Sequence, residues 1–427
     1  LDILGLLSKC DSCGRTGRSM ADTHKPSELA FKFFAEFGEE KVEKAVEAVK
    51  GFEVEVPSWI FGVFGGGRFG EYSPPGAARN IFEKLDDASV IHKLTGATPR
   101  IATHILWDLS KNGYEGDFEV ARKVKEEARQ RGLNLGAINP TYFLHGSHRG
   151  SFSAEEKEAR ERYIKQTILG GKIAKELANG LLTLWFPDGS LYPGQIELRD
   201  AYKNLREALK KSYKDIPRDV RILIEYNVFE PGTYSTTIPD WGTAALLAKE
   251  LGPNVGVLVD LGHHHYGTNV EQIVSMLINE GIPGGFHFNT RYAADDDLSV
   301  EPNPENARIL YELVVGDVIF NSEPLKNWAY MIDQCSSREN RIHAILHSMD
   351  SLQQLLAKAF LVDQDLLKKY QKNDEIILAN RAFNDALISA DVRPIVVKAR
   401  LDKGLSINPV EEYVKSGYQG KIESERG

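Results

Sequence analysis

Short apolar runs alternate with amphipathic stretches through the middle of the chain. The amphipathic stretches, such as residues 119–131, 154–179 and 200–216, repeat their apolar positions with the period of a helix that buries one face. The apolar runs between them are rich in valine, isoleucine and leucine, which is typical of buried strands. We predict strands at residues 100–107, 133–139, 181–186, 220–226, 255–261, 284–289 and 328–333. This alternation predicts a parallel sheet whose strands are connected by helices.

The residues that end the apolar runs favour a closed barrel over an open, doubly wound sheet. These terminal residues are polar or aromatic, and they include His104, Trp107, Trp185, Glu225, Asp260 and His287. In a (β/α)8 barrel the carboxyl ends of all strands form one rim, where side chains from different strands meet. No glycine-rich dinucleotide fingerprint follows the first run, which disfavours a Rossmann fold. We therefore predict the α/β class and a (β/α)8 TIM barrel.

The two ends of the chain are expected to lie outside this barrel. Residues 1–26 precede the first helical pattern, and Met20 begins a stretch that reads as a natural start. We expect residues 1–26 to be a disordered leader or tag-like extension. Residues 27–336 are expected to form the catalytic barrel with N-terminal helices. Residues 337–427 are predicted to be a helical C-terminal extension that packs outside the barrel or contacts another subunit.

Composition and charge exclude several classes of partner. The chain has 427 residues, with 52 Lys and Arg against 61 Asp and Glu, and a formal net charge of −9. A general affinity for nucleic acid or for an anionic membrane needs a dominant basic surface, so both are disfavoured. No apolar run is long enough for a transmembrane helix. The three cysteines cannot form a disulfide framework, and Cys10 and Cys13 lack the second pair of a zinc knuckle, so we expect a cytoplasmic protein.

Four potential metal ligands end successive apolar runs. They are Glu225, Asp260, His287 and Asp333. Three carboxylates and one imidazole suit Mn²⁺, Mg²⁺ or Co²⁺ better than a structural zinc. In the alternative, each residue only hydrogen-bonds to a helix N-terminus or a neighbouring loop. Carboxylates that are crowded on one rim repel one another unless a cation neutralises them, so we favour a metal site.

A second group of potential ligands lies on adjacent loops. His263 follows Asp260, and Asp295 and Asp297 follow His287. These three residues form a plausible second cation site, although the run of aspartates is also typical of a solvated loop or a helix cap. His104, Trp107 and Trp185 are candidates for the apolar wall of a sugar site, with ordinary core packing as the alternative. No nucleophile elbow is present, so covalent acyl chemistry finds little support.

From about Val56 to the C-terminus, the chain resembles the L-rhamnose isomerase family, in its branch with broad aldose tolerance. The motifs that carry the resemblance are PSW, GGGRF, ATPRIATHILWD, YSTTIPDWG, LVDLGHHH, GGFHFN, DDDL and MIDQ. Several of them are long and unusual, and all stand in the family's order. The resemblance implies a (β/α)8 barrel that isomerises an aldose to a ketose, with L-rhamnose to L-rhamnulose as the expected reaction. It also implies two Mn²⁺ ions per subunit, with Co²⁺ or Mg²⁺ as alternatives.

The resemblance also implies roles for individual residues. A structural metal falls on Glu225, Asp260, His287 and Asp333, and a catalytic metal falls on His263, Asp295 and Asp297. Substrate contacts fall on His104, Trp107 and Trp185, and catalytic roles fall on Asp333, His263 and Asn227. Phe69 matches an aromatic residue that reaches into a neighbouring subunit's pocket, which implies a homotetramer.

Asn227 departs from the family pattern, because the resemblance implies a lysine at this position. A lysine would hold positive charge near the first oxygen of the sugar, whereas an asparagine can donate a hydrogen bond without charge. Thr290 also departs, since the family usually has an acid there. Two alternatives therefore stay open: isomerisation or epimerisation of a different sugar, and a sugar- and metal-binding protein with weakened catalysis.

Overall fold

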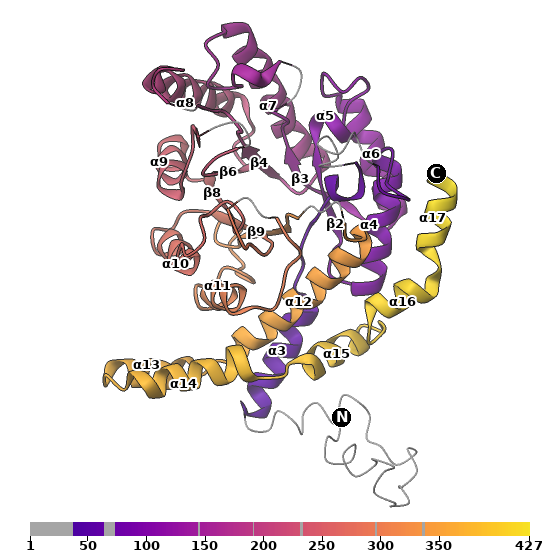
Figure 1. Ribbon diagram of the computed structural model, residues 1–427, viewed down its shortest axis with the longest axis vertical. Coiled ribbons are helices and arrows are strands. Elements are labelled where there is room, and N and C mark those ends of the chain that lie inside the picture. Colours follow the sequence, from indigo (N-terminus) through magenta and orange to yellow (C-terminus); the bar gives the residue numbers. More distant parts are fainter. Residues whose placement is uncertain are drawn as a thin grey trace, which may run out of the picture.

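The computed structural model describes residues 37–63, 73–143, 146–190, 192–230, 234–294, 297–334 and 338–427. In this part of the chain, strands form a central barrel and helices surround it (Figure 1). The expectation for residues 1–26 and the helical prediction before residue 37 lie outside the described residues. So do Phe69 and Asp295.

Eight parallel strands make up the barrel within the described residues. In spatial order they are β1 (Val56–Pro57), β2 (Arg100–His104), β3 (Asn134–Asn139), β4 (Leu181–Trp185), β6 (Arg221–Glu225), β8 (Val255–Asp260), β9 (Gly284–Phe288) and β10 (Ala329–Ile332). The barrel closes beside β1, because Glu55 N donates to Tyr330 O over 2.9 Å and Ile332 N donates to Glu55 O over 3.0 Å. The predicted TIM barrel is confirmed.

The barrel strands differ from the predicted strands at two places. The run 100–107 ends as a strand at His104, and residues Ile105–Asp108 form the short helix α5, so Trp107 lies on a helix. The first barrel strand, β1, was not predicted. It is only two residues long and contains a proline, and therefore it gives no periodic signal.

Helices cover the outside of the barrel (Figure 1). They are α3 (Glu39–Gly51), α4 (Ile81–Thr95), α6 (Phe118–Gln130), α7 (Lys157–Leu177), α8 (Leu198–Asp215), α9 (Trp241–Leu251), α10 (Val270–Asn279) and α11 (Pro304–Val315). Short 3-10 turns occur at η4 (Trp59–Phe61) and η6 (Ser147–Arg149), and β5 (Gly189–Ser190) pairs antiparallel with β7 (Ser235–Thr236). Many helices begin at an Asn or Asp whose side chain accepts the first free N–H groups, as Asn80 does from Phe82 N and Glu83 N.

Apolar packing holds the strands on both of their faces. One cluster fills the space between strands and helices, and a smaller one fills the barrel interior with Ala102, Ala137, Leu223, Leu258 and Met331 among its members. This two-sided burial explains why the strand sequences are continuously apolar. At the opposite end from the polar rim, buried Glu55 accepts a hydrogen bond from Ala137 N over 2.7 Å.

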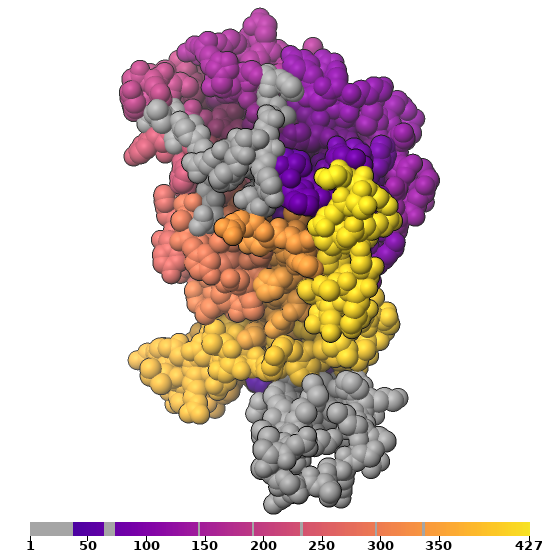
Figure 2. All heavy atoms as spheres, turned by 45° about the vertical axis from the view of Figure 1, so that its right-hand side comes forward, coloured from indigo at the N-terminus to yellow at the C-terminus, as the bar shows by residue number. Residues whose placement is uncertain are grey.

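The C-terminal helices wrap one side of the barrel. They are α12 (Arg341–Leu361), α13 (Gln364–Lys372), α14 (Ile376–Asn384), the π-helical turn η7 (Asp385–Ser389), α15 (Arg393–Asp402), α16 (Pro409–Ser416) and α17 (Tyr418–Arg426). Helix α12 packs against α3 and α11, and α16 reaches both α4 and α12. Figure 2 shows the yellow C-terminal segment lying against the early, indigo part of the chain and orange α12. No described helix combines the length and the apolar character that a membrane crossing requires.

Candidate metal centre

Four side chains from separate strands converge at the carboxyl rim of the barrel. Glu225 ends β6, Asp260 ends β8, His287 lies in β9 and Asp333 follows β10. The Nδ1 atom of His287 lies 3.0 Å from Glu225 Oε1, 3.3 Å from Asp260 Oδ2 and 3.4 Å from Asp333 Oδ2. The ligand atoms of all four residues lie within 4.8 Å of one another, a spacing at which they could hold one metal ion.

The charges of this cluster are nearly sealed from water. Glu225, Asp260 and His287 are buried, and the side chain of Asp333 is 19% exposed. Within the described part of the chain, no Lys or Arg forms an ion pair with any of the three carboxylates. Burial and the negative charges of Asp260 and Glu225 raise the pKa of Asp333 to about 7, although His287 opposes the shift.

These electrostatics fit a divalent cation. Burial alone would lower the pKa of His287, but Glu225 and Asp260 together raise that pKa well above its ordinary value. Three carboxylate oxygens face one imidazole nitrogen, so a positive charge is needed among them. This charge can be a proton on the imidazole or a metal ion between the ligands. Buried like charges are otherwise strongly unfavourable. An oxygen-rich donor set with one nitrogen suits Mn²⁺, Mg²⁺ or Co²⁺.

A second group of potential ligands shares Asp260 with the first. Its members are Asp260, His263 and Asp297, whose ligand atoms also lie within 4.8 Å of one another. His263 Nδ1 lies 3.0 Å from the carbonyl oxygen of Tyr226, an acceptor only, so Nδ1 carries the proton and Nε2 is the nitrogen available to a metal. The expected set for this site was His263, Asp295 and Asp297. The structure brings His263 and Asp297 together beside Asp260, while Asp295 falls outside the described residues.

Asn289 joins the two groups of ligands. Its Nδ2 donates to Asp260 Oδ1 over 2.8 Å and to Asp297 Oδ1 over 3.4 Å, and the residue is fully buried. Asp260 Oδ1 also accepts from Gly262 N over 2.7 Å. A Cβ at Gly262 would lie 2.4 Å from Asp297 Oδ1, so only glycine lets the chain pass this close to the ligands.

An arc of aromatic rings extends from Asp333 to His263. Trp59 Nε1 donates to Asp333 Oδ1 over 2.9 Å, and the Trp59 ring meets the ring of His104 at 5.0 Å between centroids. From His104 the arc continues through Trp107 at 4.7 Å, and from Trp107 through Phe143 at 5.1 Å. Phe143 contacts Trp185 at 5.5 Å, and Trp185 stacks beside His263 at 6.5 Å. The expected wall residues therefore lie together next to the metal centre.

A buried ion pair holds the first part of this arc in place. Lys84 Nζ lies 2.6 Å from Asp108 Oδ1, and the side chain of Asp108 is fully buried. Asp108 Oδ2 accepts from His104 N over 2.9 Å and from Ser58 Oγ over 2.5 Å. One carboxylate thus fixes the backbone of His104 and the residue that precedes Trp59. Burial lowers the pKa of His104 to about 3, so this imidazole is neutral.

Comparison with known proteins shows which family this chain resembles. The family model described as "Xylose isomerase-like TIM barrel" matches residues 101–303. A protein of Rhizobium meliloti named "Probable sugar isomerase" is 37% identical over 396 residues, which cover 90% of this chain and 88% of that relative. The chain belongs to the xylose isomerase-like TIM barrel family.

Two further similarities extend the comparison of this family member. A protein of Mesorhizobium japonicum, also named "Probable sugar isomerase", is 34% identical over 393 residues, covering 90% of this chain and 89% of the relative. A solved xylose isomerase domain protein from Alicyclobacillus acidocaldarius has 14% identity and a TM-score of 0.50, over 72% of this chain and 99% of that one. The solved structure is a likeness of fold alone.

Asn227 occupies the barrel rim of this xylose isomerase-like chain, two residues after Glu225. It is buried, and its Nδ2 donates to Glu230 Oε1 over 2.8 Å. Its backbone carbonyl oxygen accepts from Thr236 Oγ1 of β7, so the small two-stranded sheet of β5 and β7 supports this part of the rim.

Sequence reasoning missed three residues that complete the site. Trp59 and Phe143 extend the aromatic arc, and Asn289 bridges the carboxylates. Trp59 belongs to the PSW motif that carries the family resemblance, but no role was assigned to it. A signal for Asn289 did exist, since it directly follows the strand that carries His287. His264, for which no role was assigned, is buried and bonded through Nε2 to the hydroxyl of Tyr226 at 2.8 Å.

Proposed function

We propose that the protein is a metal-dependent aldose–ketose isomerase, with L-rhamnose to L-rhamnulose as its reaction. The observation that carries the proposal is the cluster of three carboxylates around His287, beside a wall of aromatic rings. The names of the two curated relatives, both probable sugar isomerases, support the same class of reaction.

The proposed cofactor is Mn²⁺, two ions per subunit, with Co²⁺ or Mg²⁺ as alternatives. Glu225, Asp260, His287 and Asp333 would hold one ion. The second would be held by His263 and Asp297, with Asp260 close by and Asp295 as the further ligand that the family resemblance implies. Bound divalent cations would polarise the sugar carbonyl and lower the pKa of a neighbouring hydroxyl.

The chain's own residues would position the open-chain sugar and move a proton. The rings of Trp107 and Trp185 offer apolar faces to the carbon backbone of the sugar, and neutral His104 can exchange a hydrogen bond with a hydroxyl without adding charge. Asp333 and His263 lie at opposite ends of the aromatic arc. We assign the proton-handling role to Asp333, and the catalytic role of His263 would be to hold the second ion through Nε2. Hydrogen then passes between the first two carbons, by a hydride shift or through an enediol.

The catalytic role of Asn227 is to donate a hydrogen bond to the first oxygen of the sugar. A lysine at this place would add a charge-assisted contact worth about 1.5–3 kcal/mol, so the asparagine predicts turnover roughly tenfold to a hundredfold slower if nothing replaces the charge. The active assembly is proposed to be a homotetramer, with Phe69 reaching a neighbouring subunit.

The test is a panel of aldoses and ketoses, including L-rhamnose, assayed after chelation and after readdition of Mn²⁺, Co²⁺ or Mg²⁺. Formation of L-rhamnulose only with added metal supports the proposal, and absence of any ketose or epimer with every sugar and ion contradicts it.

Two alternatives give different results in the same panel. An isomerase or epimerase of another sugar would convert that sugar faster than L-rhamnose. A binding protein with lost catalysis would bind sugar in calorimetry and yield no product, and Asn227→Lys would then be the variant in which turnover returns.

A further inference from the structure

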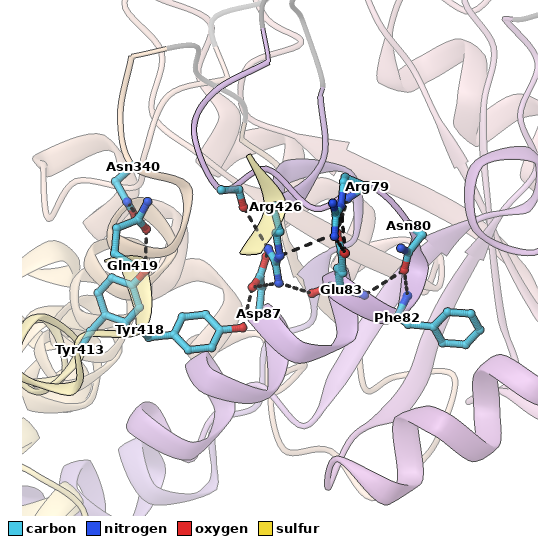
Figure 3. Close-up of polar contacts among 11 residues, drawn as sticks. Arg79, Asn80, Phe82, Glu83, Asp87, Asn340, Tyr413, Tyr418, Gln419 and Arg426 are labelled. Carbon is cyan, nitrogen blue, oxygen red and sulfur yellow. Dashed lines mark hydrogen bonds and ion pairs between the residues drawn. The ribbon is translucent and has the colours of Figure 1, made fainter. Parts of the chain in front are cut away.

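Helix α17 ends in a buried ion pair with helix α4 of the barrel. The guanidinium of Arg426 in α17 donates to Asp87 Oδ2 over 2.7 Å and to Asp87 Oδ1 over 2.9 Å (Figure 3). Tyr418 donates its hydroxyl to the same carboxylate over 2.8 Å. The side chains of Arg426 and Asp87 are only 5% and 3% exposed, so the pair is shielded from water and from salt.

Arg426 also holds a backbone segment that leads to the metal centre. Its Nη1 donates to Gly76 O over 3.0 Å. Gly76 has φ +72, and a Cβ there would lie 2.9 Å from Ile422 Cγ1, so α17 sits directly on this glycine. Two residues later, Ala78 N donates to Phe61 O over 2.8 Å, which ties the segment to η4. Helix η4 begins with Trp59, the residue that hydrogen-bonds Asp333.

The same helix contacts the start of α12. Gln419 Oε1 accepts from Asn340 Nδ2 over 2.6 Å and from the Tyr413 hydroxyl over 2.8 Å (Figure 3). Asn340 caps α12 by accepting from His343 N over 3.0 Å. Seven positions separate Asn340 from Asp333 in the sequence. One short helix therefore contacts both the segment that leads to Trp59 and the start of α12, seven positions after Asp333.

A second chain of contacts runs from α17 through α4 to the aromatic arc. Asp87 and Glu83 face Arg426 from α4, and Lys84, between them in the same helix, pairs with Asp108 at 2.6 Å. Asp108 accepts from the backbone N–H of His104 and from Ser58. A displacement of α4 would therefore move Asp108, and through it the backbone of His104 and Ser58, the residue before Trp59.

We propose that α17 is a positioning element of the metal centre. In this proposal, Arg426 and Gln419 keep Trp59 and Asp333 at hydrogen-bonding distance. Arg426 contacts neither the metal ligands nor the aromatic arc, so it acts through Asp87, Gly76 and the segment that carries Trp59. The inference rests on the proposed metal centre and assigns to the end of the chain a part in forming it.

The experiment measures Mn²⁺ binding by calorimetry in the full-length protein, because this readout does not require turnover. Arg426→Gln removes the ion pair, and Lys421→Gln is the matched control, since it removes one charge from an exposed position of the same helix. We expect Arg426→Gln to weaken Mn²⁺ binding about tenfold, the size of effect known for groups that orient metal ligands, and Lys421→Gln to leave it unchanged.

The decisive comparison repeats the change in a protein that lacks the Trp59 hydrogen bond. If α17 acts through Trp59, Arg426→Gln lowers Mn²⁺ affinity in the native background and has little further effect in a Trp59→Phe background. Equal losses in both backgrounds, or a lower melting temperature with unchanged Mn²⁺ affinity, overturn the inference. If Arg426→Gln does not fold, Tyr418→Phe, which removes one hydrogen bond to Asp87, replaces it in the same cycle.

These outcomes are separate from the fate of the proposed reaction. Suppose that the protein converts no sugar, but Arg426→Gln lowers Mn²⁺ affinity only when Trp59 is present. This result would contradict the isomerase proposal and support the role of α17. If the protein isomerises L-rhamnose and Arg426→Gln and Trp59→Phe lower Mn²⁺ affinity additively, the isomerase proposal is supported and the role of α17 is contradicted.

Discussion

His287 Nδ1 lies 3.0 Å from Glu225 Oε1, although the two residues stand on strands that are separated by β8. Asp260 of the intervening strand approaches the same nitrogen to 3.3 Å, and Asp333 closes the group from β10. Parallel strands in register bring these side chains to one height of the barrel, which is how residues far apart in sequence form one centre. The concentration of negative charge around one imidazole predicts that a bound cation stabilises the site.

Metal removal is expected to lower both thermal stability and activity. A ligand that binds only the folded protein stabilises it by about 2.7 kcal/mol when its concentration is a hundred times its dissociation constant. Chelation removes this stabilisation and leaves three carboxylates facing one another, so the melting temperature should fall and recover when Mn²⁺ is restored. Scanning calorimetry before chelation, after it, and after readdition of each ion measures the effect. An unchanged melting temperature after complete chelation would be incompatible with a resident ion.

Asp333→Asn should separate metal binding from folding. The substitution keeps the shape of the side chain and removes a charge that its neighbours disfavour, as the raised pKa of Asp333 indicates. The metal-free variant should therefore melt at or above the temperature of the metal-free native protein, while Mn²⁺ affinity and turnover fall more than about a hundredfold. Thermal melts and calorimetric titration measure the two quantities.

His287→Ala serves as the companion change and His347→Ala as its control. His287 faces the carboxylates, whereas His347 lies exposed on α12. Loss of metal-dependent turnover is expected only in the first. Native turnover in His287→Ala, or in Asp333→Asn, would refute the assignment of the four ligands.

Asn289→Ala should weaken binding at both groups of ligands. The amide holds Asp260 Oδ1 and Asp297 Oδ1 at once, and its removal leaves buried carboxylate oxygens without that donor. We expect Mn²⁺ affinity to fall about tenfold, as for other groups that orient ligands. The control is Asn204→Ala, which removes one hydrogen bond from Asn204 of α8 to the carbonyl oxygen of Ala154. A result in which the two variants bind Mn²⁺ equally well would remove Asn289 from the site.

The order of the strands and the convergence of the four expected ligands could be predicted from the sequence because both leave local signals. An apolar run such as residues 255–261 is buried on both faces, and the carboxylate that ends it breaks the pattern at the rim. The expected ligands Glu225, Asp260, His287 and Asp333 therefore lie where strand ends predict them. Whether they bind Mn²⁺ remains a proposal that the metal-removal experiment tests.

Other features depend on contacts that no local pattern reports. Strand β1 is defined by its hydrogen bonds to β2 and by the closure at Glu55, and its own two residues carry no period. Trp59 donates a hydrogen bond to Asp333, a residue 274 positions away in the chain. The docking of Arg426 on Asp87 likewise spans 339 positions. Such pairings belong to the closed barrel, and they become visible only when the fold is known.

The buried, neutral His104 is expected to make the folded protein less stable in mild acid. Burial lowers the pKa of its folded-state imidazole to about 3, against an ordinary value of 6.5. Between these two values the unfolded chain binds more protons than the folded one, so the free energy of unfolding falls as the pH falls from 6.5 toward 3. One pH unit below the unfolded pKa, at pH 5.5, this single group should cost about 1.4 kcal/mol. Urea unfolding at pH 7.5 and pH 5.5 measures the loss, and His104→Gln should reduce it by about that amount. His148→Gln, at an exposed position, is the control and should lose as much stability between pH 7.5 and pH 5.5 as the native protein does. An equal loss in all three proteins would show that His104 is not held neutral by burial.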